Sequence, residues 1–154
     1  SDILSKHGIE NMRISIGRDM YVRGRIGARH WYMSVAHPNR PSQDLIQLYV
    51  GSHAVATRSW SDRFALKGKQ RYHDVLDPRT GKPASGVIQT TVISTDSVLA
   101  DALSAAIFVL GPKQGVALLN ELKQAEGFII DTNGQVFGSR GMVDYGRLPS
   151  RIAL

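Results

Sequence analysis

The spacing of apolar residues changes once along the chain, and this change most constrains the fold. From Thr95 or Asp96, either of which can cap a helix, apolar residues recur every three or four positions as far as Leu110. Gly111 is suited to end that helix, and Pro112 fits the first turn of another because its missing N–H costs nothing there. The pattern predicts two consecutive helices.

The second of these helices carries an apolar stripe within residues 116–122, and we expect Gly127 to end it. The segments that follow, GFIID, TNGQ and VFGS, span residues 127–139. They are typical of a hairpin, because the Asn133-Gly134 step tolerates the positive φ of a tight turn. The helices are therefore expected to lead into a further pair of strands.

Before residue 95 the chain is typical of β-structure, with alternating or β-branched runs and short connections. The predicted strands cover residues 12–17, 20–23, 31–37, 45–51, 54–57, 71–76 and 87–95. Short connections favour antiparallel pairing, since parallel strands need long crossovers. The prediction is a single α+β domain over residues 1–154, mostly antiparallel sheet with two helices toward the C-terminal third.

Composition narrows the classes of function. The net charge is +6 and the pI about 9.9, but the basic residues are scattered and no nucleic-acid motif is present, so a nucleic-acid partner is not expected. A modest net positive charge could equally attract a phosphorylated small molecule. The chain has no cysteine, which excludes disulfides, thiolate zinc sites and cysteine nucleophiles.

Two local features carry candidate chemistry. The turn DPRTGKP, residues 77–83, sits before a β-branched strand and, taken alone, is best explained as a well-made hairpin loop. Asp101 lies off the apolar stripe of the first helix among small residues, which leave room for a ligand to approach its carboxylate. A hydroxyl at position 105 would complete a hard-cation site, but that residue is Ala105.

Several short segments, taken in order, resemble the C-terminal half of the ApbE family of FAD:protein FMN transferases, or flavin transferases. They are residues 16–19 (IGRD), 56–57 (AT), 77–83 (DPRTGKP), 87–94 (VIQTTVIS), 100–103 (ADAL) and 108–115 (FVLGPKQG). The pair DPRTG and ADAL, at this spacing, is the most specific part. The resemblance covers residues 3 to 137, and the family's N-terminal part has no counterpart in the chain.

The resemblance implies metal-assisted phosphoryl chemistry. Such an enzyme cleaves the pyrophosphate of FAD, passes FMN to a threonine or serine of an acceptor redox protein and releases AMP, with Mg²⁺ neutralising phosphate charge. It implies FAD contacts at Arg18, Asp19, Asp74 and Val75, and a metal contact at Asp101. It also implies a periplasmic or membrane-associated location and, because half of the family's fold is missing, a second chain or a homo-oligomer.

The chain departs from the family's pattern in four places. Arg18 replaces a glycine, and Arg58-Ser59 replaces Ser-Gly. Asp74, the candidate catalytic residue, stands where the resemblance implies a histidine, and His73 would face the other side of a strand. Ala105 replaces the metal-binding threonine, so magnesium is expected to bind weakly.

These departures leave alternatives open. The chain is either a partial or divergent flavin transferase, or a non-catalytic module that binds flavin or a partner protein. A third reading, a basic β-rich domain that binds nucleic acid, makes the motif match accidental. The substitutions themselves suggest that arginines, which suit phosphate geometry, hold a phosphorylated or flavin-like ligand in place of a metal.

Overall fold

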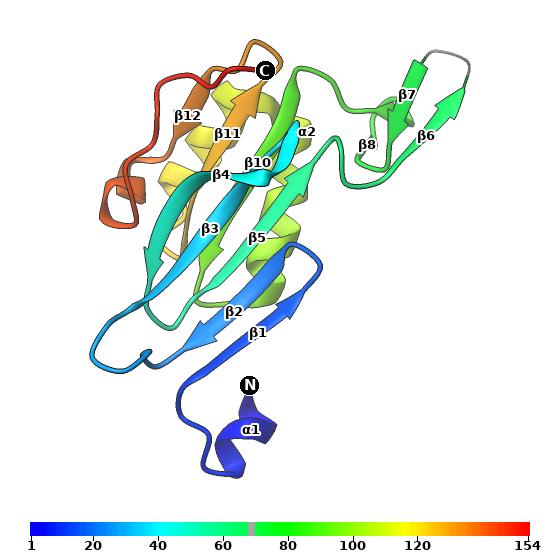
Figure 1. The fold of residues 1–154 in the computed structure, drawn as a ribbon. Helices are drawn as coiled ribbons and strands as arrows, with labels where there is room; N and C mark the ends of the chain where they lie inside the picture. Colours follow the sequence, from blue (N-terminus) through cyan, green and yellow to red (C-terminus); the bar gives the residue numbers. More distant parts are fainter. Residues whose placement is uncertain (68–69) are drawn as a thin grey trace.

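A computed structural model describes residues 1–67 and 70–154 of the chain. Figure 1 shows a sheet with a two-stranded ribbon over one face and a helical layer behind the other. The sheet has the strand order β1-β2-β5-β10-β11-β12, and every neighbouring pair is antiparallel. Its strands are β1 (Met12–Ile16), β2 (Asp19–Arg23), β5 (Ala54–Ser59), β10 (Val87–Ser94), β11 (Ala125–Asp131) and β12 (Val136–Gly138).

Three short two-stranded units complete the β-structure described. The ribbon consists of β3 (Trp31–His37) and β4 (Arg40–Val50), and a hairpin of β6 (Phe64–Lys67) and β7 (Gln70–His73) projects from the body of the fold (Figure 1). Strands β8 (Leu76–Asp77) and β9 (Lys82–Pro83) flank the DPRTG turn. The helical elements are α1 (Asp2–Lys6), α2 (Ser97–Glu121) and the 3-10 turn η1 (Arg140–Asp144).

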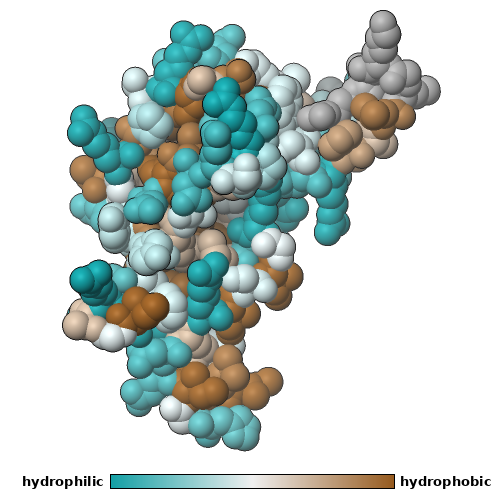
Figure 2. Space-filling view, in the orientation of Figure 1, coloured by the Kyte–Doolittle hydropathy of each residue, from teal (hydrophilic) through white to brown (hydrophobic). Residues whose placement is uncertain are grey.

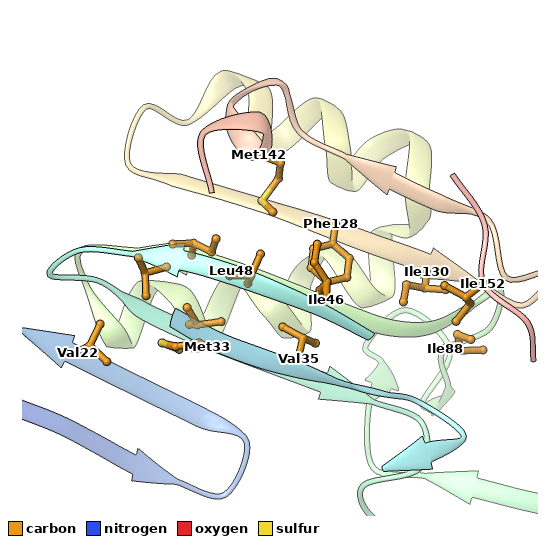
Figure 3. Packing of buried hydrophobic residues seen from close by; sticks show 13 residues of the cluster. Val22, Met33, Val35, Ile46, Leu48, Ile88, Phe128, Ile130, Met142 and Ile152 are labelled. Atoms are coloured by element: carbon orange, nitrogen blue, oxygen red, sulfur yellow. The ribbon is translucent and has the colours of Figure 1, made fainter. Parts of the chain in front are cut away.

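The sheet is covered on both faces, which explains why β10 is buried along its whole length. Figure 3 shows the first core, where side chains of the β3–β4 ribbon meet those of the sheet. Met33 and Leu48 from the ribbon and Ile88 and Phe128 from the sheet all belong to this core. A second core lies between the sheet and α2, and includes Phe108 and Ile129. Burial on both sides fits a strand as rich in Val, Ile and Thr as β10.

The prediction of two consecutive helices is wrong: the structure has one long helical element, α2, with a kink at Gly111. The φ of 77° and ψ of 178° at Gly111 are not helical, yet the helix resumes at once through Pro112. A Cβ placed on Gly115 would lie 3.0 Å from the Cβ of Ile107, whereas residues eight apart in a straight helix are about 12 Å apart. The two arms of α2 therefore fold against each other.

Other predicted boundaries also changed. Strand β4 starts at Arg40, inside the expected loop 38–44, because an irregular ribbon edge accepts Pro41. The predicted strand 71–76 is split between β7 and β8. Gly127 does not end a helix: α2 stops at Glu121, and Gly127 lies within β11.

The length and apolar composition of α2 would suffice to cross a membrane. However, Ala100, Ile107 and Leu119 of α2 are fully buried in the core against the sheet, so here it serves as the core helix. Apolar surface is visible around α1 at the opposite end from the C-terminus (Figure 2). Ile3 and Ile9 there are 74% and 42% exposed.

Candidate functional site

A cavity of about 560 Å³ lies where the β1–β2 turn, the end of β5 and the segment after it meet. We call it the arginine cavity. Its charged lining residues are Arg18, Asp19, Arg58, Asp62, Arg63 and Asp74. The arginine cavity thus gathers three of the four implied FAD contacts, Arg18, Asp19 and Asp74, in one place.

The β1–β2 turn places Arg18 and Asp19. Ile16 pairs with Asp19, which leaves a two-residue turn, and Gly17 takes the positive φ of 61° that this turn needs. Arg18 then reaches Asp62, with 2.5 Å between Nε and Oδ1. Asp62 also accepts a hydrogen bond of 2.8 Å from the backbone N–H of Ser59. Burial raises the pKa of Asp62, and Arg18 opposes that rise.

The other arginine joins the sheet to the helix. Arg58, on β5, forms an ion pair with Asp101 on the first arm of α2. The Asp19 carboxylate lies close by and accepts a hydrogen bond of 3.2 Å from the backbone N–H of Thr57. Burial raises the pKa of Asp19 and the charge of Asp101 adds to the rise, whereas the Thr57 N–H and Arg58 oppose it.

The raised pKa of Asp19 predicts a pH-dependent gain in stability for Asp19→Asn. Between the ordinary value of 3.8 and the raised pKa, the folded state holds a proton that the unfolded state has lost, so wild-type stability falls as pH rises through that window. The side chain that Asp19→Asn introduces does not ionise, so the variant does not lose stability in this window. At neutral pH it should be more stable, by less than about 1 kcal/mol because the group is partly solvated. Urea unfolding of the wild type and the variant at a series of pH values from 3 upward tests this. Free energies of unfolding that change with pH in the same way in both proteins would contradict it.

The oxygen atoms around Asp101 do not fit a magnesium ion. Its carboxylate is already paired with Arg58, and Ala105 offers no side-chain oxygen. The neighbouring hydroxyl of Ser104 is buried and donates to the backbone oxygen of Asp101 at 2.7 Å. Within residues 1–67 and 70–154, no group of three or more His, Cys, Asp or Glu side chains is placed to hold a metal. Magnesium needs several oxygen ligands, so no step is assigned to it.

His73 and Asp74 face in opposite directions. His73 is buried, with Nε2 2.9 Å from the backbone oxygen of Ala84 and its ring edge-on to Phe108. Asp74 is exposed and lines the arginine cavity. Next to it, Val75 is buried and its backbone oxygen accepts a hydrogen bond of 2.9 Å from the N–H of Ala84. Asp74 is thus the polar side chain that this segment offers to a ligand.

The DPRTG turn is held together by its own polar groups. The Asp77 carboxylate accepts hydrogen bonds from the backbone N–H and the guanidinium of Arg79 at 2.8–2.9 Å. The side-chain and backbone hydrogen bonds from Arg79 hold the pKa of Asp77 below its ordinary value. The N–H groups of Thr80 and Gly81 donate to the backbone oxygen of Asp77. This part of the motif shapes the loop, as expected from the turn taken alone.

A second hollow, the apolar groove, adjoins the arginine cavity. Its volume is about 550 Å³, and it shares Arg58 and Asp74 with that cavity. Its apolar lining comes from the segment before the turn and from α2: Val75, Leu76, Pro78, Ala106, Val109 and Leu110. The implied contact Val75 and the substituted position Ala105 both line this groove. A charged cavity and an apolar groove therefore meet at two shared residues.

Sequence reasoning missed Asp62 and the pairing of Arg58 with Asp101. Asp62 lies in the stretch RSWSDRF, which has no clear period. Both ion pairs join residues more than forty positions apart, Arg18 to Asp62 and Arg58 to Asp101. No local pattern specifies such partners. The only available signal was that two arginines replace small residues within the family's motifs.

Comparison with known proteins identifies the family. A sequence model of the ApbE family matches residues 1–129. The FAD:protein FMN transferase of Klebsiella pneumoniae is 28% identical over 137 residues, which cover 88% of this chain and 42% of the relative. That of Vibrio cholerae is 30% identical over 124 residues, 77% of this chain and 36% of the relative.

Solved structures agree in fold. The ApbE protein of Thermotoga maritima superimposes with a TM-score of 0.82 at 30% identity, covering 89% of this chain and 45% of that one. The flavin transferase ApbE of Vibrio cholerae, at 22% identity, shares the fold with a TM-score of 0.75 over 94% of this chain and 47% of its own. The chain spans less than half the length of these relatives. From the match over residues 1–129, the chain belongs to the ApbE family.

Proposed function

We propose that the protein is an FAD-binding flavin transferase, which moves FMN from FAD to a serine or threonine of an acceptor protein. Its relatives carry the name FAD:protein FMN transferase. The observation that carries the proposal is the arginine cavity adjoining the apolar groove, with Arg58 and Asp74 in both. FAD is likewise divided into charged and apolar parts, since its charged pyrophosphate is flanked by flat aromatic rings.

In the proposed reaction an acceptor hydroxyl attacks the phosphorus atom of the FMN half of FAD. A new P–O bond forms to the hydroxyl oxygen, the anhydride P–O bond breaks, and AMP leaves with the bonding electrons. The hydroxyl proton passes to a base. Asp74, exposed where the cavity meets the groove, is the proposed acceptor of that proton. Arg18 and Arg58 would stabilise the phosphate charge.

Asp101 has a different proposed role from the metal ligand that the resemblance implies. Its ion pair with Arg58 ties the guanidinium to the first arm of α2. A guanidinium held in one orientation loses less side-chain freedom when a phosphate binds. We therefore assign Asp101 to the positioning of Arg58.

The test is a fluorescence titration of FAD into the purified protein, with AMP followed in the same samples. The experiment is run with and without an excess of EDTA, and with serine- and threonine-containing acceptor protein. Binding together with AMP release supports the transferase. Absence of FAD binding under all these conditions would overturn the proposal.

A second candidate function is a non-catalytic module that binds flavin or a partner protein. The paired state of Asp101 and the missing side-chain oxygen at Ala105 favour it. Its signature in the same titration is FAD binding without any AMP, even when the acceptor is present.

The remaining expectations stay predictions. Fractionation of the source cells tests the periplasmic or membrane-associated location. The mass of the protein in solution, measured by light scattering, tests the expectation of a homo-oligomer, and co-purification tests that of a second chain. An acceptor redox protein would be recognised by FMN bound covalently to one of its hydroxyl side chains.

A further inference from the structure

Two arginines that line the arginine cavity each have a guanidinium nitrogen without a hydrogen-bond partner in the described part of the chain. Arg18 Nη1 and Arg58 Nε are buried from solvent and form no hydrogen bond within the described chain. A buried N–H without an acceptor costs free energy. The two arginines come from separate elements, and both line the arginine cavity.

Carboxylates already hold both arginines in place. Arg18 is fixed by Asp62 and Arg58 by Asp101, so each ion pair leaves part of a planar donor fork unused. Both of these carboxylates are engaged by the arginines. Besides Asp62, the cavity lining contains the carboxylates of Asp19, which accepts a hydrogen bond from the Thr57 N–H, and of the exposed Asp74. Arg63 adds a further positive charge at the rim.

The donors fit a phosphate better than a neutral ligand. A carbonyl or hydroxyl oxygen can satisfy one arginine, whereas a phosphate or pyrophosphate offers several oxygens to both. Guanidinium groups match phosphate geometry and keep their charge at every physiological pH. No divalent cation is needed to neutralise the oxyanion, which agrees with the poor oxygen ligand set around Asp101.

We propose that Arg18 and Arg58 form a phosphate-binding site that works without a divalent cation, with the guanidinium of Arg58 supplying the positive charge beside Asp101. This inference deepens the proposed function and rests on it for one point, the identity of the phosphate as the pyrophosphate of FAD. The site itself follows from two arginines that line one cavity, each held by a carboxylate and each with donors that the ion pair leaves unused.

The test is calorimetric titration of inorganic pyrophosphate into the protein in excess EDTA. We expect binding in wild type and a loss of at least tenfold in affinity for both Arg18→Ala and Arg58→Ala. Arg147→Ala is the matched control, because Arg147 is exposed, outside both hollows, and loses the same charge. Its affinity should stay within twofold of wild type. Inorganic phosphate is titrated in parallel, to separate a one-phosphate from a two-phosphate site.

Arg18→Lys and Arg58→Lys separate a loss of binding from a loss of the fold, because lysine keeps the positive charge but lacks the planar fork of donors. We expect them to retain the thermal midpoint of wild type and to lose affinity several-fold. Pyrophosphate binding that appears only after Mg²⁺ is added would overturn the proposal. So would alanine variants that fold and bind as wild type does.

The two proposals fail separately. Pyrophosphate binding that depends on both arginines, without any FAD binding, would remove the transferase function and leave the anion site. FAD binding that is unchanged in both alanine variants under EDTA would remove the arginine site and leave the flavin function. An activity measurement is not needed for either conclusion.

Discussion

Gly127→Ala is expected to destabilise the fold by about 3 kcal/mol, because the added methyl group would meet backbone on the neighbouring strand. A Cβ at Gly127 would lie 2.4 Å from the backbone oxygen of Thr91 and 3.3 Å from the Cα of Val92, both in β10. On the helix side, the side chain of Leu119 would be 3.2 Å away. Backbone in a central strand cannot move aside as a flexible side chain can. Urea unfolding followed by circular dichroism gives the free-energy difference.

Gly51→Ala is the control for this prediction. Its Cβ would meet only the Nδ1 atom of His53 at 3.8 Å, an ordinary contact, and its φ is not in the left-handed region. We expect no loss, or a gain of less than about 1 kcal/mol from the reduced freedom of the unfolded chain. Equal destabilisation by both substitutions would show that the cost comes from losing a glycine and not from the contact with β10.

Val109→Asp is expected to lower FAD affinity at least tenfold. Val109 lines the apolar groove on the first arm of α2, and a carboxylate there would be desolvated by any ring that entered. It would also repel the phosphates in the adjoining cavity. The effect is measured by the same fluorescence titration, with the thermal midpoint recorded to confirm that the variant is folded.

Val98→Asp, on the same arm, introduces the same charge outside the groove. Val98 is 76% exposed and follows the capping residue Asp96, where an acidic side chain is favourable to the helix. FAD affinity should therefore stay within about twofold of wild type. If both variants bind FAD as wild type does, the rings do not occupy the groove.

Much of the sheet could be predicted because its strands are encoded locally. The alternating run MRISI gave β1, and β10 was marked by its β-branched residues, both to within one residue. The predicted strand 45–51 starts five residues later than β4, since a ribbon edge tolerates Pro41 where a central strand would not. The sequence pattern predicts a helix end at Gly127, although the role of Gly127 in the fold depends on Thr91, thirty-six residues earlier.

The candidate site was predictable only where it coincides with motifs. Resemblance to the ApbE family pointed to Arg18, Asp19 and Asp74, which the structure brings to one cavity. It also implied a metal at Asp101, whereas the structure pairs that carboxylate with Arg58. An ion pair between a strand and a helix depends on how the two elements pack. Packing is a property of the whole fold, so no stretch of sequence read alone contains it.

The kink in α2 also bears on how the chain reaches its folded state. Ser94 and Ala125 are partners in the β10–β11 ladder, so the thirty residues between them leave the sheet and return to the same end of it. Closing a flexible loop of that length costs conformational entropy. The two helical arms, folded at Gly111, bring the ends of this segment together and leave far fewer dihedral angles free than a flexible loop would. The turn at Gly111 thus lets β10 and β11 pair as if they were close neighbours in sequence.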